Sequence, residues 1–211
     1  MLQFMLGGIN DAQRERIRTN ICHQLSFVVS RLERLERIKV HPEEKYVSIS
    51  KEMNRIPSFE SIVSQLEQVS KEVAEVTNDE LLRDSIRKYR LDALHEEHET
   101  TMQNLFNWTW TSELWQNADM DQANRIIFSE NIRTNDKAVF ITAVTLSCFE
   151  FVDATKMLFL LDCYLVEDDA ISQRALVGFV LLFHFFYIQL EDNQELKDRL
   201  SVYSDDATFI H

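Results

Sequence analysis

The sequence predicts an all-α protein in which antiparallel helical hairpins stack as a short α-solenoid, with longer helices at the N-terminal end. Two observations carry this prediction. The chain has only three glycines and two prolines in 211 residues, and its apolar residues recur at helical spacing. Sheet proteins need turn residues much more often than this. The shortage of glycine also excludes glycine-rich phosphate loops and the glycine-flanked serine turn of α/β-hydrolases.

Two segments of the first half carry a clean apolar stripe. In residues 11–39, apolar side chains recur from Ile17 to Leu35 in steps of three and four, which is typical of a helix with one apolar face. Residues 59–76 follow a strict heptad pattern. We expect this heptad seam to pack on the 11–39 helix. A homodimer formed through the same seam is the structural alternative.

The second half is predicted to consist of shorter hairpins. Its apolar segments are separated by short breaks that carry Asn or Asp, the residues that cap helix N-termini. Residues 136–144 align with residues 168–176 at an offset of 32, a period typical of helical-repeat proteins. We therefore divide the chain into a long-helix hairpin region, 1–106, and a helical-repeat region, 107–211. One continuous α-solenoid is the alternative.

The second repeat carries a resemblance to known repeat families. Asp168, Ile171, Arg174 and Ala175 resemble the start of a hairpin helix in HEAT-type repeats, and the period resembles that of tetratricopeptide repeats. The tail from Ile171 onward also resembles large uncharacterised helical-repeat proteins of gut Bacteroides-type bacteria. The resemblance covers residues 135–206. It implies a scaffold-like α-solenoid and brings no catalytic residues.

The charge of the chain is unevenly placed. Residues 1–106 carry 15 basic and 18 acidic side chains, whereas residues 107–211 carry 7 and 17, within a net charge of -13. An acidic surface repels nucleic-acid phosphates and anionic lipid, so we expect neither as a partner. A basic protein or peptide is the partner that this charge favours.

Composition also predicts where the protein works. The longest apolar run, residues 175–188, is shorter than the roughly 20 residues that span a bilayer, so we expect a core helix there and no membrane partner. Cys22, Cys148 and Cys163 are widely spaced, which indicates reduced thiols and a cytoplasmic protein. Because apolar residues follow the turn at 204–206 and then stop, we expect a segment of a longer protein.

Three tryptophans form the first candidate for partner binding. Trp108, Trp110 and Trp115 all fall within eight residues. Tryptophan is enriched at protein interfaces, which supports a partner-binding role. Packing in the core, or where two helical groups meet, is the favoured explanation of the same residues.

Acidic side chains at the predicted inter-helix turns form the second candidate. In a solenoid they would line one edge, where they would dock a basic peptide. Helix capping and solubility explain the same residues without a partner. The candidate residues are Asp168, Asp169, Glu191 and Asp192.

One cluster resembles a metal site. Asp92, His95, His98 and Glu99 would place two imidazoles and two carboxylates near one helical face. The histidines are three residues apart, which is not the zincin spacing, and a solvated charged helix explains the cluster without a metal. We therefore predict no catalytic residue, metal site or cofactor. A metal-dependent enzyme at His95 and His98 is the rival function.

Two further expectations concern side chains inside apolar helices. Cys148 and Cys163 are expected to be buried structural thiols, and His184 a hydrogen-bonded core histidine. Taken together, the sequence predicts a non-enzymatic scaffold for protein–protein interaction.

Overall fold

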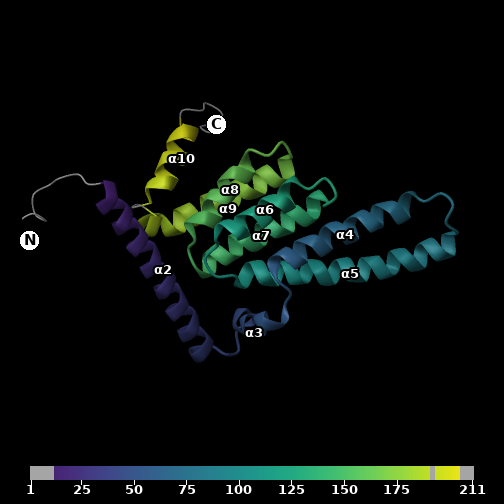
Figure 1. The fold of residues 1–211 in the computed structure, drawn as a ribbon, viewed down its shortest axis with the longest axis horizontal. Helices are drawn as coiled ribbons and strands as arrows, with labels where there is room; N and C mark the ends of the chain where they lie inside the picture. Colours follow the sequence, from purple (N-terminus) through teal and green to yellow (C-terminus); the bar gives the residue numbers. More distant parts are fainter. Residues whose placement is uncertain (1–11, 191–192, 205–211) are drawn as a thin grey trace, which may run out of the picture. The chain divides into compact units, whose positions relative to one another are not determined.

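The computed structural model describes residues 12–190 and 193–204, and within these ranges the protein is helical throughout, without a β-strand (Figure 1). This confirms the all-α prediction. The helices are α2 (Ala12–Val40), α3 (Lys45–Glu52), the 3-10 turn η1 (Met53–Arg55), α4 (Phe59–Asn78), α5 (Asp84–Thr111), α6 (Asn117–Phe128), α7 (Thr134–Glu150), α8 (Ala154–Tyr164), α9 (Asp169–Leu190) and α10 (Gln194–Ser204).

The chain divides into two compact units between Val47 and Ser48. The division that we predict between residues 106 and 107 falls inside α5 instead, because this helix runs without interruption through both positions.

In the first unit, α2 is the single long helix predicted for residues 11–39. Near its end, Arg37 Nε donates to Glu44 at 2.6 Å, and the guanidinium lies 4.8 Å from the centre of the Tyr46 ring. The apolar stripe of α2 is more than half exposed, at 51–61 % for each member: Ile17, Ile21, Leu25, Val28, Leu32 and Leu35.

In the second unit, α4 and α5 form a long antiparallel hairpin (Figure 1). Ser58 caps α4, because its hydroxyl accepts the Ser61 N–H. The heptad seam is buried against α5 and α6 inside this unit, through Phe59, Ile62, Leu66 and Val69. The predicted packing of the seam on the 11–39 helix is therefore wrong. Val73 and Val76, at the other end of the seam, are half-buried, and a homodimer through the seam stays a prediction.

Two series of contacts connect the helices that follow. Helix α4 contacts α6, and α6 contacts α8; helix α5 contacts α7, and α7 contacts α9. Side-chain bonds fix the relative direction of α7 and α9. Thr134 bonds to Asp168 near the start of both helices, and Thr142 accepts from Arg174 further along. The two helices therefore run in the same direction.

Close approach of α7 and α9 depends on the single glycine of the second half. A Cβ atom added at Gly178 would lie 2.4 Å from Thr145 Oγ1, which is closer than real Cβ atoms come to a neighbour. The glycine thus lets α9 pack tightly on the Thr145 side chain of α7. Helix α9 kinks once, at Phe186, where the backbone leaves helical geometry.

One face of α9 belongs to the core of the second unit. Ile171, Ala175, Phe179 and Leu182 are buried at steps of three and four. Among the described residues, Asp169–Tyr187 is a segment long and apolar enough to cross a membrane, and 28 % of it is buried. The burial of its stripe confirms that α9 contributes to the core.

Aromatic rings fill the centre of the second unit. Phe59 stacks on Trp108 with ring centroids 4.1 Å apart, and Trp115 stacks on Phe140 at 6.3 Å. Phe159 meets Trp115 edge to face at 5.5 Å. These rings come from α4, α5, α7, α8 and the α5–α6 connection, so the cluster joins most of the unit.

A buried lysine holds the α5–α6 connection in place. Lys156, only 1 % exposed, donates from Nζ to the Ser112 and Glu113 carbonyls at 3.3 and 3.0 Å and to Ser147 Oγ at 2.8 Å. The Asp153 carboxylate lies 3.9 Å away and accepts the Trp115 backbone N–H at 2.8 Å. The ammonium group is thereby bonded and paired, as a buried charge requires.

Replacing Lys156 by methionine tests this role. The variant keeps the length of the side chain but leaves the buried Asp153 carboxylate without its counter-charge and the Ser112 and Glu113 carbonyls without their donor. We expect the free energy of unfolding to fall by about 3–5 kcal/mol, measured by urea denaturation. Lys197→Met, at an exposed position of α10, is the control and should change stability by less than about 0.5 kcal/mol. Equal stability of the two variants would contradict the role of Lys156.

Candidate functional site

The structure places the predicted tryptophans inside or against the core. Trp115 is 3 % exposed, so its predicted contact with a partner is wrong, and the packing alternative is confirmed for it. Trp108 is half-buried and stacked on Phe59. Trp110 is half-buried, and its ring lies 5.9 Å from that of Phe106. All three occupy the place where the α4–α5 hairpin meets the helices that follow.

The four residues of the predicted acidic edge have different outcomes in the structure. Asp168 caps α9, accepting the N–H groups of Ala170 and Ile171 at 3.0 and 3.4 Å, and also accepts the Thr134 hydroxyl at 2.7 Å. These bonds, the Thr134 hydroxyl first, lower the pKa of the Asp168 carboxyl. The capping explanation thus accounts for Asp168. Asp169 is exposed in the first turn of α9, and the remaining two predicted residues, Glu191 and Asp192, lie outside the described residues.

The residues of the metal-like cluster do not converge. Asp92, His95 and Glu99 are exposed along α5, whereas His98 is buried and faces α7. Within the described residues, no group of three or more His, Cys, Asp or Glu side chains is arranged to hold a metal ion. The rival prediction of a metal site at His95 and His98 therefore lacks its geometry. His184, predicted in the core, is exposed.

His98 instead joins a polar cluster that links α5 to the start of α7. Its Nε2 lies 3.0 Å from Asp136 Oδ2, and both groups are buried. Arg133 completes the cluster: its Nε donates to Asp136 Oδ2 at 3.2 Å, and its Nη2 lies 3.3 Å from His98 Nδ1 and 3.1 Å from Nε2. If Nε2 carries the proton toward Asp136, Nδ1 is the ring nitrogen that accepts from Arg133.

Asp136 belongs to one of the short breaks whose Asn and Asp residues are predicted to cap helices, but it is not a cap. The residue preceding α7 is Arg133, which makes no side-chain capping bond, and Asp136 lies inside the first turn. Its carboxylate turns toward α5 because His98 and Arg133 offer it charge-compatible donors in a buried setting. Asp153 and Asp168, in contrast, do cap α8 and α9.

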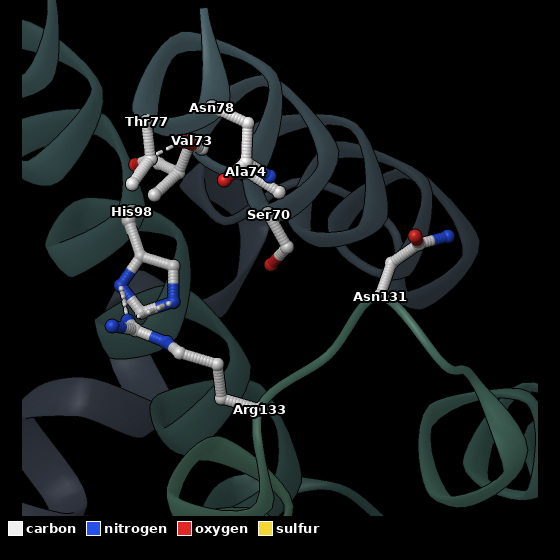
Figure 2. A pocket seen from close by; sticks show the side chains of 8 residues that line it. All are labelled: Ser70, Val73, Ala74, Thr77, Asn78, His98, Asn131 and Arg133. Carbon is white, nitrogen blue, oxygen red and sulfur yellow. Dashed lines mark hydrogen bonds between the residues drawn. The ribbon is translucent and has the colours of Figure 1, made fainter.

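A pocket of about 320 Å³ opens beside this cluster, between α4, α5 and the α6–α7 connection (Figure 2). Helix α4 supplies one wall, His98 another, and the connection supplies the third. The Ser70 hydroxyl, on a residue that is 8 % exposed, points into the space between His98 and Asn131 (Figure 2) and has no hydrogen-bond partner. The lining residues are Ser70, Val73, Ala74, Thr77, Asn78, His98, Asn131 and Arg133.

Ser70, His98 and Asp136 are the residue types of a hydrolase triad, but their arrangement differs from one. A triad histidine accepts the serine proton through the ring nitrogen that does not face the carboxylate. Here that nitrogen, Nδ1, lies against Arg133 Nη2, and Ser70 Oγ makes no hydrogen bond with the ring. The cluster is therefore arranged to hold the Arg133 guanidinium at the pocket wall.

The second unusual surface is apolar and lies on α7 and α9. Leu146, Phe149, Val177, Leu181 and Phe185 are 37–65 % exposed, and we call this set the α7–α9 face. The rings of Phe149 and Phe185 meet edge to face at 5.7 Å, which joins the two helices at this face. Large exposed apolar side chains gathered in one place are unusual on a surface that faces only water.

Comparison with known proteins adds no relative: no protein-family model, no curated protein and no solved structure matches the chain. The resemblance to helical-repeat families therefore stays a prediction.

Sequence reasoning missed the parts that make the pocket. Arg133 and Asp136 lie 35 and 38 residues from His98, and no local pattern connects residues at that distance. The α7–α9 face did leave a signal, because the apolar run of α9 contains more apolar residues than one helix face buries.

Cysteine reactivity tests the described core. Burial raises the pKa of Cys148 and of Cys163 to about 12, whereas Cys22 is exposed. We expect a thiol reagent at pH 8 to modify Cys22 rapidly in the folded protein, and all three cysteines only after denaturation in urea. Rapid modification of three thiols in the folded state would contradict the burial of Cys148 and Cys163.

The same two thiols predict a pH dependence of stability. They stay protonated in the folded protein but lose their protons near pH 8.5 when it unfolds. Because the folded pKa is the higher one, their contribution is constant below about pH 8.5 and is lost as pH rises toward about 12, at up to ~1.4 kcal/mol per pH unit and thiol. The double variant Cys148→Ala, Cys163→Ala should lose less stability between pH 8 and 10.5 than the parent protein does.

Proposed function

We propose that the protein is a non-enzymatic, cytoplasmic helical-repeat scaffold that binds another protein. The observation that carries this proposal is the α7–α9 face, where five large apolar side chains stay exposed next to a well-packed core. Exposed apolar patches of this kind mark interaction surfaces in soluble proteins. No cofactor is needed for such a role.

The order of helix contacts supports the scaffold part of the proposal. In stacked hairpins, the first helices of successive hairpins contact one another, and so do the second helices. The contacts α4–α6–α8 and α5–α7–α9 follow this order, and α7 runs parallel to α9. We propose on this basis that α4 to α9 form a short α-solenoid of the HEAT or tetratricopeptide kind. Helices α6 and α7 depart from the ideal, since they are not among the closely packed pairs.

Charge identifies the kind of partner. Residues 48–211 contain 14 Lys and Arg against 29 Asp and Glu, a net charge of -15. Two copies of so acidic a unit repel each other, whereas a basic partner is attracted. The α7–α9 face is apolar in its middle, so the partner must also bring apolar side chains. We therefore propose a basic amphipathic helix of another protein as the occupant of this face.

Site-specific photo-crosslinking in the native cells identifies such a partner. A photoreactive phenylalanine derivative at Leu181 should cross-link to one main protein, through a segment that is basic and amphipathic. The same group at Leu81, which is 97 % exposed in the α4–α5 connection, is the matched control and should not give this product. Identical products at both positions, or products with a second copy of this chain, would overturn the proposal.

A titration with a synthetic peptide of the cross-linked segment then measures the face directly. We expect Leu181→Asp to weaken binding at least about tenfold, because one buried apolar side chain at an interface contributes more than about 1.4 kcal/mol. The same change at Leu81 should leave the affinity unchanged. Leu181→Asp adds a negative charge, so attraction by charge alone predicts equal or tighter binding, and that result would count against the α7–α9 face.

A further inference from the structure

We infer that the pocket between α4, α5 and the α6–α7 connection binds a small carboxylic acid, with the carboxylate held by Arg133 and Ser70. This site is separate from the α7–α9 face and does not rest on the proposed scaffold function. Its evidence is the donor chemistry of the lining, one orphaned buried hydroxyl, and the size and apolar wall of the cavity.

The lining offers hydrogen-bond donors and lacks carboxylates. Arg133 uses Nε and Nη2 to bond with Asp136 and His98, which leaves Nη1 with no partner among the described residues. The bonds to Asp136 and His98 therefore fix the guanidinium at the pocket wall before any ligand binds. The remaining Nη1 of a guanidinium fixed in this way is suited to a carboxylate oxygen, because hydrogen bonds between charged groups are the strong ones.

The amide group of Asn78 adds a further donor at the rim, and it has no hydrogen-bond partner among the described residues. Thr77 contributes no proton, because its hydroxyl already donates to the Val73 carbonyl at 2.6 Å. Asp136 is not among the lining residues, and its carboxylate is already bonded to the imidazole of His98 and the guanidinium of Arg133.

Ser70 is the independent sign of a ligand. Its side chain is more than nine-tenths buried, its Oγ has no hydrogen-bond partner, and it points into the cavity (Figure 2). Buried hydroxyls in folded proteins are nearly always bonded, and leaving one unpaired destabilises the fold. A serine within a helix often donates to the carbonyl four residues earlier, yet this one does not. An acceptor atom of a ligand in the pocket would supply the hydrogen bond that the Ser70 hydroxyl lacks.

Size and polarity narrow the class of ligand. About 320 Å³ is at the small end of the range for small-molecule pockets. Val73 and Ala74 form an apolar strip of α4 beside the donors, which accommodates a short hydrocarbon chain. Arg133 is paired with Asp136, so the cluster matches a singly charged carboxylate better than a doubly charged phosphate, which would lack a second cation.

Nuclear magnetic resonance on the ¹⁵N-labelled 211-residue chain tests this site, with sodium butyrate as the probe at constant pH and ionic strength. We expect saturable shifts of amide signals around Ser70, His98 and Asn131, with a dissociation constant of about 1 mM or below. Butyramide has the same shape without the charge and should bind at least about tenfold more weakly. No saturable shift with butyrate would overturn the inference.

Variants locate the binding. Arg133→Gln should weaken butyrate binding at least about tenfold, and Ser70→Ala about fivefold, as expected for a lost charged and a lost neutral hydrogen bond. Arg174→Gln removes another exposed arginine, which bonds to Thr142 on α7, and should leave binding unchanged. Because Arg133 is exposed, its variant should fold, and a dispersed spectrum verifies this. Equal binding by Arg133→Gln, or saturable shifts with inorganic phosphate but not with butyrate, would overturn the inference.

Discussion

The buried ammonium group of Lys156 is the constraint on which the second unit depends. A charge removed from water is tolerable only if every one of its donors finds an acceptor. Lys156 meets this demand with the carbonyls of Ser112 and Glu113 after α5 and the hydroxyl of Ser147 in α7 as acceptors. The carboxylate of Asp153 before α8 balances its charge at 3.9 Å. The α5–α6 connection therefore has little freedom of position, and it delivers Trp115 into the aromatic cluster between Phe140 and Phe159.

The position of α7 follows from that core and in turn creates both surfaces of interest. With Phe140 packed against Trp115 and Phe59, the first turn of α7 comes to lie beside the middle of α5, where Asp136 meets His98. The other flank of α7 receives α9 at the close contact of Thr145 with Gly178. The polar pocket and the α7–α9 face are thus on helices that one core orients, although they share no side chain and take different chemistry.

Much of the architecture was predictable, because it rests on local signals. Spacing of three and four predicts α2 and α4, and the Asn and Asp residues of the short breaks predict the starts of α8 and α9, which Asp153 and Asp168 cap. Which helices pack against one another was not predictable in the same way. The seam of α4 is an apolar stripe that could pack on any other apolar stripe, so the sequence does not distinguish α5 from the 11–39 helix as its partner. The polar cluster depends on three residues that only the folded chain brings together, and Asp136 carries the same local pattern as a true cap.

The fold does not require the hydroxyl of Ser70, whereas a binding function would. Alanine there would pack against the same neighbours, favour the helix more strongly and leave no unpaired hydroxyl in a buried place. Val73 shows that the same wall of the pocket accepts an apolar side chain. The local stability of the fold gains nothing from the hydroxyl at this position, which is the pattern expected where a side chain serves a molecule that binds there.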